Sequence, residues 1–147
     1  MERESAGRGR VAIVGAGPGG MAAALAAHRS GFAVDLYEAY PEIKAAGNIL
    51  NLWPPPQKVL KLIGVDTEDL GAPAHSSFRR NDGHLRATVV LPQAVMDEYG
   101  GGFIGLLRWG LYQRMIAALP EGVLHMNQRL TRFADGAGGV TLHFEDG

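Results

Sequence analysis

The feature that most constrains this chain is a glycine-rich turn, GAGPGG, that begins at Gly15. A short β-branched run at 11–14 precedes the turn, as in a strand that is buried on both faces of a parallel sheet. An alanine-rich segment at 20–30 follows it and predicts a helix that ends before Gly31. A second short strand is expected at 33–37, so the first 38 residues predict a right-handed βαβ unit with two parallel strands.

Three glycines of the turn are spaced as GxGxxG, and glycine is required at each of these positions for a different steric reason. Gly15 permits the tight turn out of the strand, Gly17 lets a pyrophosphate approach the backbone, and Gly20 lets the helix lie close to the sheet. The N–H groups at the helix start and its partial positive charge then favour phosphate, which we expect between Gly17 and Gly20, with Gly19 between them. Glu38 ends the second strand, where a carboxylate can accept hydrogen bonds from ribose hydroxyls and repel a 2′-phosphate. The pattern predicts dinucleotide binding, and its spacing does not separate FAD from NAD.

The remainder of the chain predicts further helices and antiparallel strands. A helix is expected at 57–63, opened by three prolines, which the first turn of a helix tolerates. Helical spacing of apolar residues predicts another helix at 109–119. An Asp-Gly pair between two alternating runs predicts a β-hairpin. The expected strands are 76–80, 85–91, 123–133 and 140–144, and 39–49 is expected to be a loop.

Composition excludes several classes of function. The 147 residues include 14 Lys and Arg, 15 Asp and Glu, five His and no Cys. Because the charges balance and no basic cluster is present, we do not expect the chain to bind the phosphate backbone of a nucleic acid. Without cysteine no disulfide framework forms, which fits a cytoplasmic location, and the five histidines lack the mutual spacing of a metal site. Glycines interrupt the apolar run at 11–27, so we expect no membrane span, and we expect one domain over 11–147 after a flexible tail at 1–10.

The stretches 11–39 and 47–65 together resemble the opening of flavoprotein monooxygenases of the para-hydroxybenzoate hydroxylase type, particularly the branch of salicylate and urate hydroxylases. In that family a glycine-containing loop leads to a Trp-Pro helix start, which 47–54 matches, and a strand-end arginine precedes a helix, which 107–111 matches. The segment 128–147 is similar to the family's antiparallel meander. The resemblance implies an α/β, Rossmann-like βαβ FAD-binding fold with an antiparallel hairpin and meander, incomplete without a C-terminal part.

The same resemblance implies which residues contact FAD. The glycines of the turn would approach the pyrophosphate, and Glu38 would bind the adenosine ribose with Ala39 nearby. Trp53 is interpreted as a packing residue, and no catalytic acid or base is assigned. The remaining cofactor positions implied are Gly47 and Asn51 on the flavin side, Arg108 at the ribityl–phosphate region, and Leu130, whose backbone would face adenine.

By resemblance, the chain is the N-terminal part of a flavin monooxygenase. NADPH or NADH would reduce the flavin, and one atom of O₂ would pass to an aromatic or polyketide-like substrate by hydroxylation or epoxidation. The family's later flavin-holding segment and substrate wall do not follow within the 147 residues, so we expect a complementary C-terminal polypeptide in a heteromer. Two alternatives stay open: a non-catalytic or truncated dinucleotide-binding subunit, and a fragment of an NAD-linked dehydrogenase.

Overall fold

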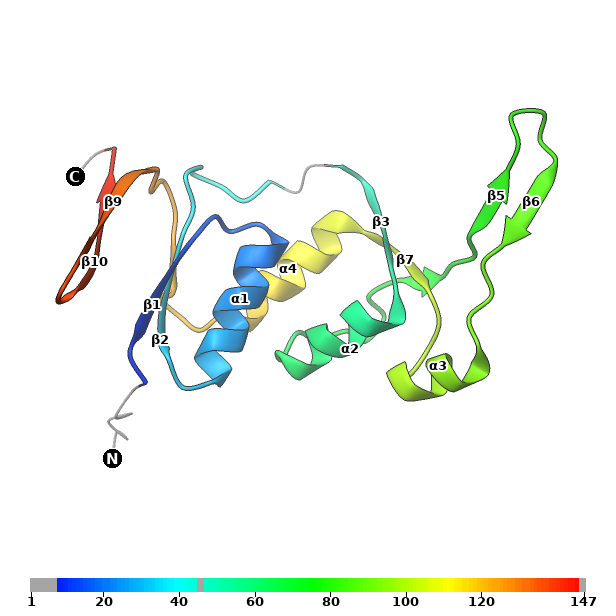
Figure 1. Ribbon diagram of the computed structural model, residues 1–147, viewed down its shortest axis with the longest axis horizontal. Coiled ribbons are helices and arrows are strands. Elements are labelled where there is room, and N and C mark those ends of the chain that lie inside the picture. Colours follow the sequence, from blue (N-terminus) through cyan, green and yellow to red (C-terminus); the bar gives the residue numbers. More distant parts are fainter. Residues whose placement is uncertain (1–7, 45–46, 146–147) are drawn as a thin grey trace. The chain divides into compact units, whose positions relative to one another are not determined.

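A computed structural model describes residues 8–44 and 47–145 of the chain (Figure 1). The internal contacts divide the chain into two compact units. Unit 1 comprises Met1–Lys44 and Met115–Gly147, and unit 2 comprises Ala45–Arg114. The single domain expected over 11–147 stays a prediction. Of the expected tail at 1–10, residues 1–7 lie outside the described residues.

Unit 1 contains a three-stranded parallel sheet in the order β1-β2-β8. Its strands are β1 (Arg10–Val14), β2 (Ala33–Tyr37) and β8 (Leu124–His125). The helix α1 (Pro18–Arg29) connects β1 to β2, as the blue elements of Figure 1 show. This arrangement confirms the expected βαβ unit, and β1 begins one residue earlier than expected, at Arg10.

Helix α1 begins and ends at residues suited to those positions. Pro18 occupies the start of the helix, where its missing N–H removes no intrahelical hydrogen bond, so α1 begins two residues before the expected Gly20. At the other end Gly31 has φ +86°, the left-handed conformation that commonly follows a helix, as expected. Met21, Ala24 and Leu25 are buried, and their spacing of three and four residues places them on one face.

The C-terminal part of unit 1 forms an antiparallel hairpin. Strands β9 (Leu130–Gly136) and β10 (Gly139–Phe144) pair with each other. The single strand expected at 123–133 is wrong, because the chain turns between β8 and β9. Asn127 adopts φ +58°, a left-handed conformation that asparagine tolerates better than most residues, and this breaks the extended run.

Unit 2 contains an antiparallel sheet in the order β3-β7-β4. Strand β7 (Ile104–Leu107) pairs with β3 (Ile49–Leu52) on one side and β4 (Ala72–Pro73) on the other. Strand β3 begins at the end of the expected loop and was not expected. Four residues show little periodicity, and the partner strand lies far along the chain, so local pattern does not identify β3.

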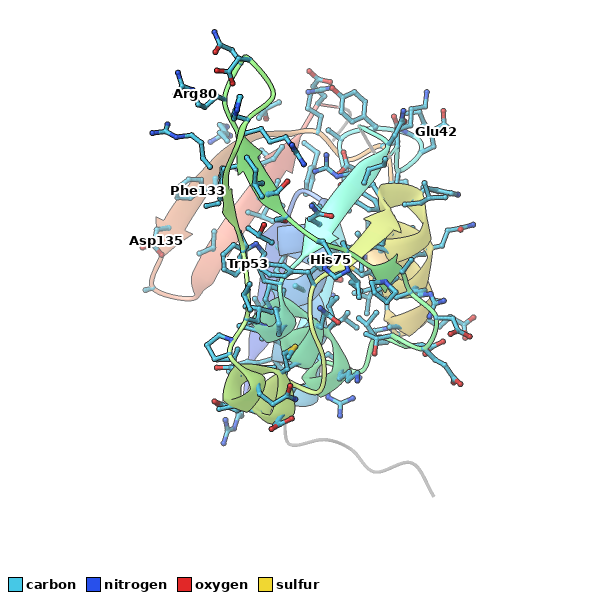
Figure 2. All side chains as sticks on the ribbon, turned by 90° about the vertical axis from the view of Figure 1, so that its right-hand side faces the viewer. Glu42, Trp53, His75, Arg80, Phe133 and Asp135 are labelled. Carbon is cyan, nitrogen blue, oxygen red and sulfur yellow. The ribbon has the colours of Figure 1, made fainter. Side chains whose placement is uncertain are left out.

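Unit 2 also contains two helices, α2 and α3, and a hairpin. Helix α2 (Pro54–Leu62) begins at the prolines themselves, three residues before the expected start, because proline fits the first helical positions. Strands β5 (Ser77–Arg79) and β6 (Leu85–Thr88) confirm the hairpin with shorter strands than expected. Arg80 lies at the turn end of this hairpin (Figure 2). Helix α3 (Gln93–Tyr99) was not expected.

Helix α4 (Arg108–Ala118) begins directly after β7, as the resemblance implies. Its start and end each lie one residue before those expected from the apolar spacing. Leu111, Tyr112 and Met115 are buried, which accounts for that spacing. Within the described residues, none of the helices has the length and apolar character needed to cross a membrane.

Candidate functional site

The glycine turn after β1 is tightly closed on one side. Gly15 has φ +97°, and its N–H donates to the carbonyl of Tyr37 at 2.7 Å, so the turn is joined to the end of β2. A Cβ atom on Gly20 would lie 1.8 Å from the carbonyl oxygen of Gly15. The start of α1 therefore approaches the turn so closely that only glycine fits at Gly20, as expected from GxGxxG.

The other side of the turn is open. Apart from the adjacent residues and the backbone of α1 itself, no atom of the described residues lies within 4 Å of the place that a Cβ on Gly17 or Gly19 would occupy, and no side chain caps α1. The N–H groups in the first turn of a helix have no partner within the helix. The turn therefore offers unobstructed N–H donors and a helix N-terminus, which together suit a phosphate group.

Glu38 lies beside this turn and contacts it directly. Its Oε2 accepts a hydrogen bond from the Ala16 N–H at 2.8 Å, and its Oε1 accepts one from the Tyr40 N–H at 3.1 Å. A carboxylate has about four acceptor positions, so two remain for other donors such as ribose hydroxyls. Unit 1 thus brings together the glycines of the turn and the acidic residue predicted to bind ribose.

The other predicted positions of unit 1 lie close to Glu38 in the chain or in the fold. Ala39 follows Glu38 directly and is half-buried. The N–H of Gln128 donates to the Glu38 carbonyl at 2.7 Å, and Leu130 begins β9 two residues later. The contacts of Ala39 and Leu130 with a cofactor stay predictions.

In unit 2, three predicted cofactor residues lie around the start of β3 and the end of β7. Gly47 has φ +82°, and a Cβ atom there would lie 3.3 Å from Nη1 of Arg108. The N–H of Arg108 donates to the carbonyl of Asn48 at 3.1 Å. Asn51 lies opposite Gly105 in the β3–β7 pair, with its Oδ1 3.4 Å from the place of a Cβ on Gly105. The structure therefore brings Gly47 and Arg108 together and places Asn51 farther along β3.

Trp53 makes a packing contact at the start of α2. Its ring meets the ring of Phe103 edge-on, with centroids 5.0 Å apart, although 56% of the Trp53 surface is exposed. This contact agrees with the interpretation of Trp53 as a packing residue.

Sequence reasoning missed a charged cluster that joins the three parallel strands of unit 1. Asp35 on β2 is 7% exposed; the Nε–H of Arg10 on β1 donates to its Oδ2 at 2.5 Å, and Nε2 of His125 on β8 lies 3.0 Å from its Oδ1. The Arg10 guanidinium and, to a lesser extent, the His125 ring hold the pKa of Asp35 below its usual range, against the opposing effect of burial. A lone acid inside the apolar strand 33–37 is the signal that could have indicated such a cluster.

The charged cluster borders an open cavity of about 840 Å³ in unit 1. Its walls include Arg10, Asp35 and Tyr37 from the sheet, and Val140, Leu142 and Phe144 from β10. Tyr37 stacks on His125 and contacts Phe144, with ring centroids 4.9 and 4.8 Å apart. No glycine of the turn lines this cavity, which distinguishes it from the candidate dinucleotide site.

The βαβ unit, the open glycine turn and the adjacent acceptor Glu38 define the class of α/β dinucleotide-binding proteins. The family model described as pyridine nucleotide-disulphide oxidoreductase matches residues 9–121, and the chain belongs to this family. Because the chain contains no cysteine, its residues cannot form the disulphide in the family's name.

Curated relatives identify a narrower group. The chain is 34% identical over 145 residues to 6-hydroxynicotinate 3-monooxygenase from Bordetella bronchiseptica, covering 96% of this chain and 38% of that protein. It is 30% identical over 141 residues to the FAD-dependent urate hydroxylase of Klebsiella pneumoniae, covering 92% and 36%. The expected resemblance to flavoprotein hydroxylases is therefore confirmed.

A solved structure supports the same relationship. The crystal structure of Klebsiella pneumoniae HpxO complexed with FAD and uric acid superposes with a TM-score of 0.79 and 29% sequence identity. The match covers 96% of this chain and 36% of that protein. The α/β fold class is thus confirmed, and the chain spans little more than a third of the length of these relatives.

Proposed function

We propose that this chain is the FAD-binding part of an NAD(P)H-dependent flavin monooxygenase that acts on an aromatic ring. The observation that carries the proposal is the Glu38 carboxylate beside an open glycine turn, in a chain whose relatives are named as monooxygenases and hydroxylases. An acidic acceptor at this position suits a free ribose diol.

The residues of unit 1 fit the adenosine and pyrophosphate half of FAD. The space beside Gly17 and Gly19 leaves room for phosphate oxygens to reach backbone N–H groups. Glu38 keeps acceptor positions for the ribose hydroxyls, and the backbone at Leu130 and Ala39 would border the adenine and ribose.

The residues of unit 2 fit the other half of the cofactor by their chemistry. The Arg108 guanidinium is a permanent cation that can bind a phosphate through two parallel hydrogen bonds. Gly47 presents a bare backbone beside that guanidinium, and the Asn51 amide can both donate and accept. We propose that these three residues contact the phosphate, ribityl and flavin portion.

When bound, the flavin supplies the redox chemistry of the reaction, and the protein supplies position and water exclusion. In the reaction proposed, O₂, NAD(P)H and one proton convert a ring C–H into C–OH, and they yield NAD(P)⁺ and water. The reductant is NADH or NADPH, and none of the described residues is assigned as catalytic acid or base.

We propose in addition that a complementary polypeptide supplies the remainder of the hydroxylase fold. The matched region is only 36–38% of the length of these relatives, so most of their fold has no counterpart among the 147 residues. The substrate wall and the shielding of the flavin would then come from that second polypeptide.

Flavin retention tests the proposed cofactor. The purified chain, incubated with FAD and freed of excess by gel filtration, should retain flavin absorbance, while FMN, which lacks the adenosine half, should be lost. Gly17→Val places a branched side chain where phosphate must approach, so it should abolish retention. If Gly17→Val retained as much FAD as the unmodified chain, the pyrophosphate of FAD would not bind at the glycine turn.

A titration tests the ribose contact. Glu38→Ala removes a charged acceptor, and a hydrogen bond of that kind contributes roughly 1.5–3 kcal/mol. We therefore expect FAD affinity to fall by about 10- to 150-fold. Unchanged affinity would mean that Glu38 does not bind the cofactor.

A further inference from the structure

Glu38 contacts the glycine turn, in addition to its proposed role as an acceptor for the ribose hydroxyls. Its carboxylate accepts from the N–H of Ala16, which lies inside the GAGPGG turn, and from the N–H of Tyr40 in its own loop. Ala16 is 1% exposed, so water does not readily replace this acceptor. A buried N–H that loses its acceptor destabilises the conformation that holds it.

The backbone of Glu38 is held in place independently of its side chain. Its N–H donates to the carbonyl of His125 at 2.8 Å, and its carbonyl accepts from the N–H of Gln128 at 2.7 Å. The carboxylate therefore extends from a fixed point at the end of β2 towards the turn. A contact made from a fixed backbone position restrains the turn more than one made from a mobile loop.

We infer that Glu38 is a positioning residue that holds the glycine turn in its phosphate-binding conformation before any cofactor binds. The inference rests on the proposed function, because it assigns the turn to phosphate. It adds to the ribose contact a second role for the same carboxylate, exerted through the N–H of Ala16. The two roles use different acceptor positions and can operate together.

A ligand without ribose separates the two roles. Inorganic pyrophosphate can reach the turn but offers no hydroxyl to Glu38. If Glu38 bound only ribose, Glu38→Ala would leave pyrophosphate affinity unchanged or would raise it, because a nearby negative charge is removed. If Glu38 positions the turn, the same variant should weaken pyrophosphate binding, by about tenfold for the loss of one hydrogen bond to a charged group.

Amide hydrogen exchange of the cofactor-free chain tests the positioning directly. In Glu38→Ala the Ala16 amide should exchange at least about tenfold faster, since its acceptor is gone. The Gly15 amide, which donates to the Tyr37 carbonyl, should stay protected and serves as the internal control. Glu42→Ala removes an equal charge from an exposed residue that pairs with Lys44, and it should change neither amide.

A second variant keeps the test valid if Glu38→Ala does not fold. Glu38→Gln has nearly the same shape but one acceptor oxygen, and both carboxylate oxygens accept backbone N–H groups here. It should therefore lose protection at Ala16 or at Tyr40 and keep it at the other. Unchanged exchange at both amides, or pyrophosphate affinity that is equal or higher in Glu38→Ala, would overturn the inference. If the unmodified chain bound neither FAD nor pyrophosphate, the proposed function would fail, and the exchange of Ala16 would still decide the positioning role.

Discussion

At the scale of single residues, two positions of the GxGxxG motif, Gly17 and Gly20, require glycine for different physical reasons. Gly20 is required by the fold, because a side chain there would meet the carbonyl oxygen of Gly15. Gly17 faces open space, so the fold does not require glycine there, and we expect the requirement to come from a bound phosphate. Substitutions at the two positions should therefore affect different properties.

Gly20→Ala should lower the free energy of unfolding by about 3 kcal/mol, because backbone must move to admit the Cβ. Gly17→Ala should change that free energy by less than about 0.5 kcal/mol, since its φ of −69° suits any residue, yet it should weaken FAD binding. Denaturant unfolding and FAD titration measure the two effects. Equal destabilisation by both variants would contradict this division.

Gly47 combines a backbone requirement with a neighbour. Its φ of +82° disfavours other residues by about 1 kcal/mol, and a Cβ would press on Arg108. Gly47→Ala should therefore destabilise unit 2 slightly and reduce FAD affinity about tenfold through displacement of the guanidinium. Gly83→Ala is the matched control, because Gly83 has φ +87° and, among the described residues, open space around it. It should lower the free energy of unfolding by a similar amount and leave FAD affinity unchanged. If both variants bound FAD equally well, the contact between Gly47 and Arg108 would have no role in cofactor binding.

At the scale of elements, Asp35 joins the strands β1, β2 and β8 through Arg10 and His125. Asp35→Asn should lower the free energy of unfolding by about 1 kcal/mol at neutral pH. This is below the roughly 1.5–3 kcal/mol of a hydrogen bond to a charged group, because the Arg10 side chain is largely exposed and solvent weakens the interaction. Because the pKa of folded Asp35 lies below its usual value of 3.8, its stabilisation is present above that value and is lost as pH falls through the folded pKa.

The difference between Asp35→Asn and the unmodified chain should therefore shrink as the pH is lowered below about 4, measured by urea unfolding across a pH series. Asp135→Asn, at an exposed position of β9, is the control and should change stability little at any pH (Figure 2). A difference that grew on acidification would show that the charge of Asp35 opposes folding.

Several elements were predictable because their signals are local. The glycine that ends α1 and the Asp-Gly pair of the β5–β6 hairpin act within a few residues. Strand β3 and the separation of β8 from β9 were not predictable in this way. They depend on pairing with β7 and β2, which lie far from them along the chain.

At the scale of the whole molecule, large apolar side chains are exposed in both units. Under the proposed function, the remainder of the hydroxylase fold would cover part of this surface. The exposed apolar residues include Val14, Ile49, Phe78, Val90, Phe133 and Val140.

From the proposed function, the isolated chain should bind FAD and yet show no NAD(P)H-dependent hydroxylation, because the flavin would stay open to water. Addition of a polypeptide related to the remaining part of the hydroxylases should restore the reaction and form a heteromer with a large apolar interface, about 2,000 Å² or more. Sedimentation together with product analysis measures both. A stable monomer that hydroxylates an aromatic substrate by itself would defeat this proposal.

The sequence by itself determined the βαβ unit, the glycine turn and the position of Glu38 at a strand end, because these follow from steric and periodic rules over short distances. Only the tertiary structure decided that the Glu38 carboxylate bonds the N–H of Ala16, and that Asp35 lies between Arg10 and His125. These contacts join residues that are 22, 25 and 90 positions apart. Local patterns carry no information on such pairs, because pairing and packing of the strands bring them together.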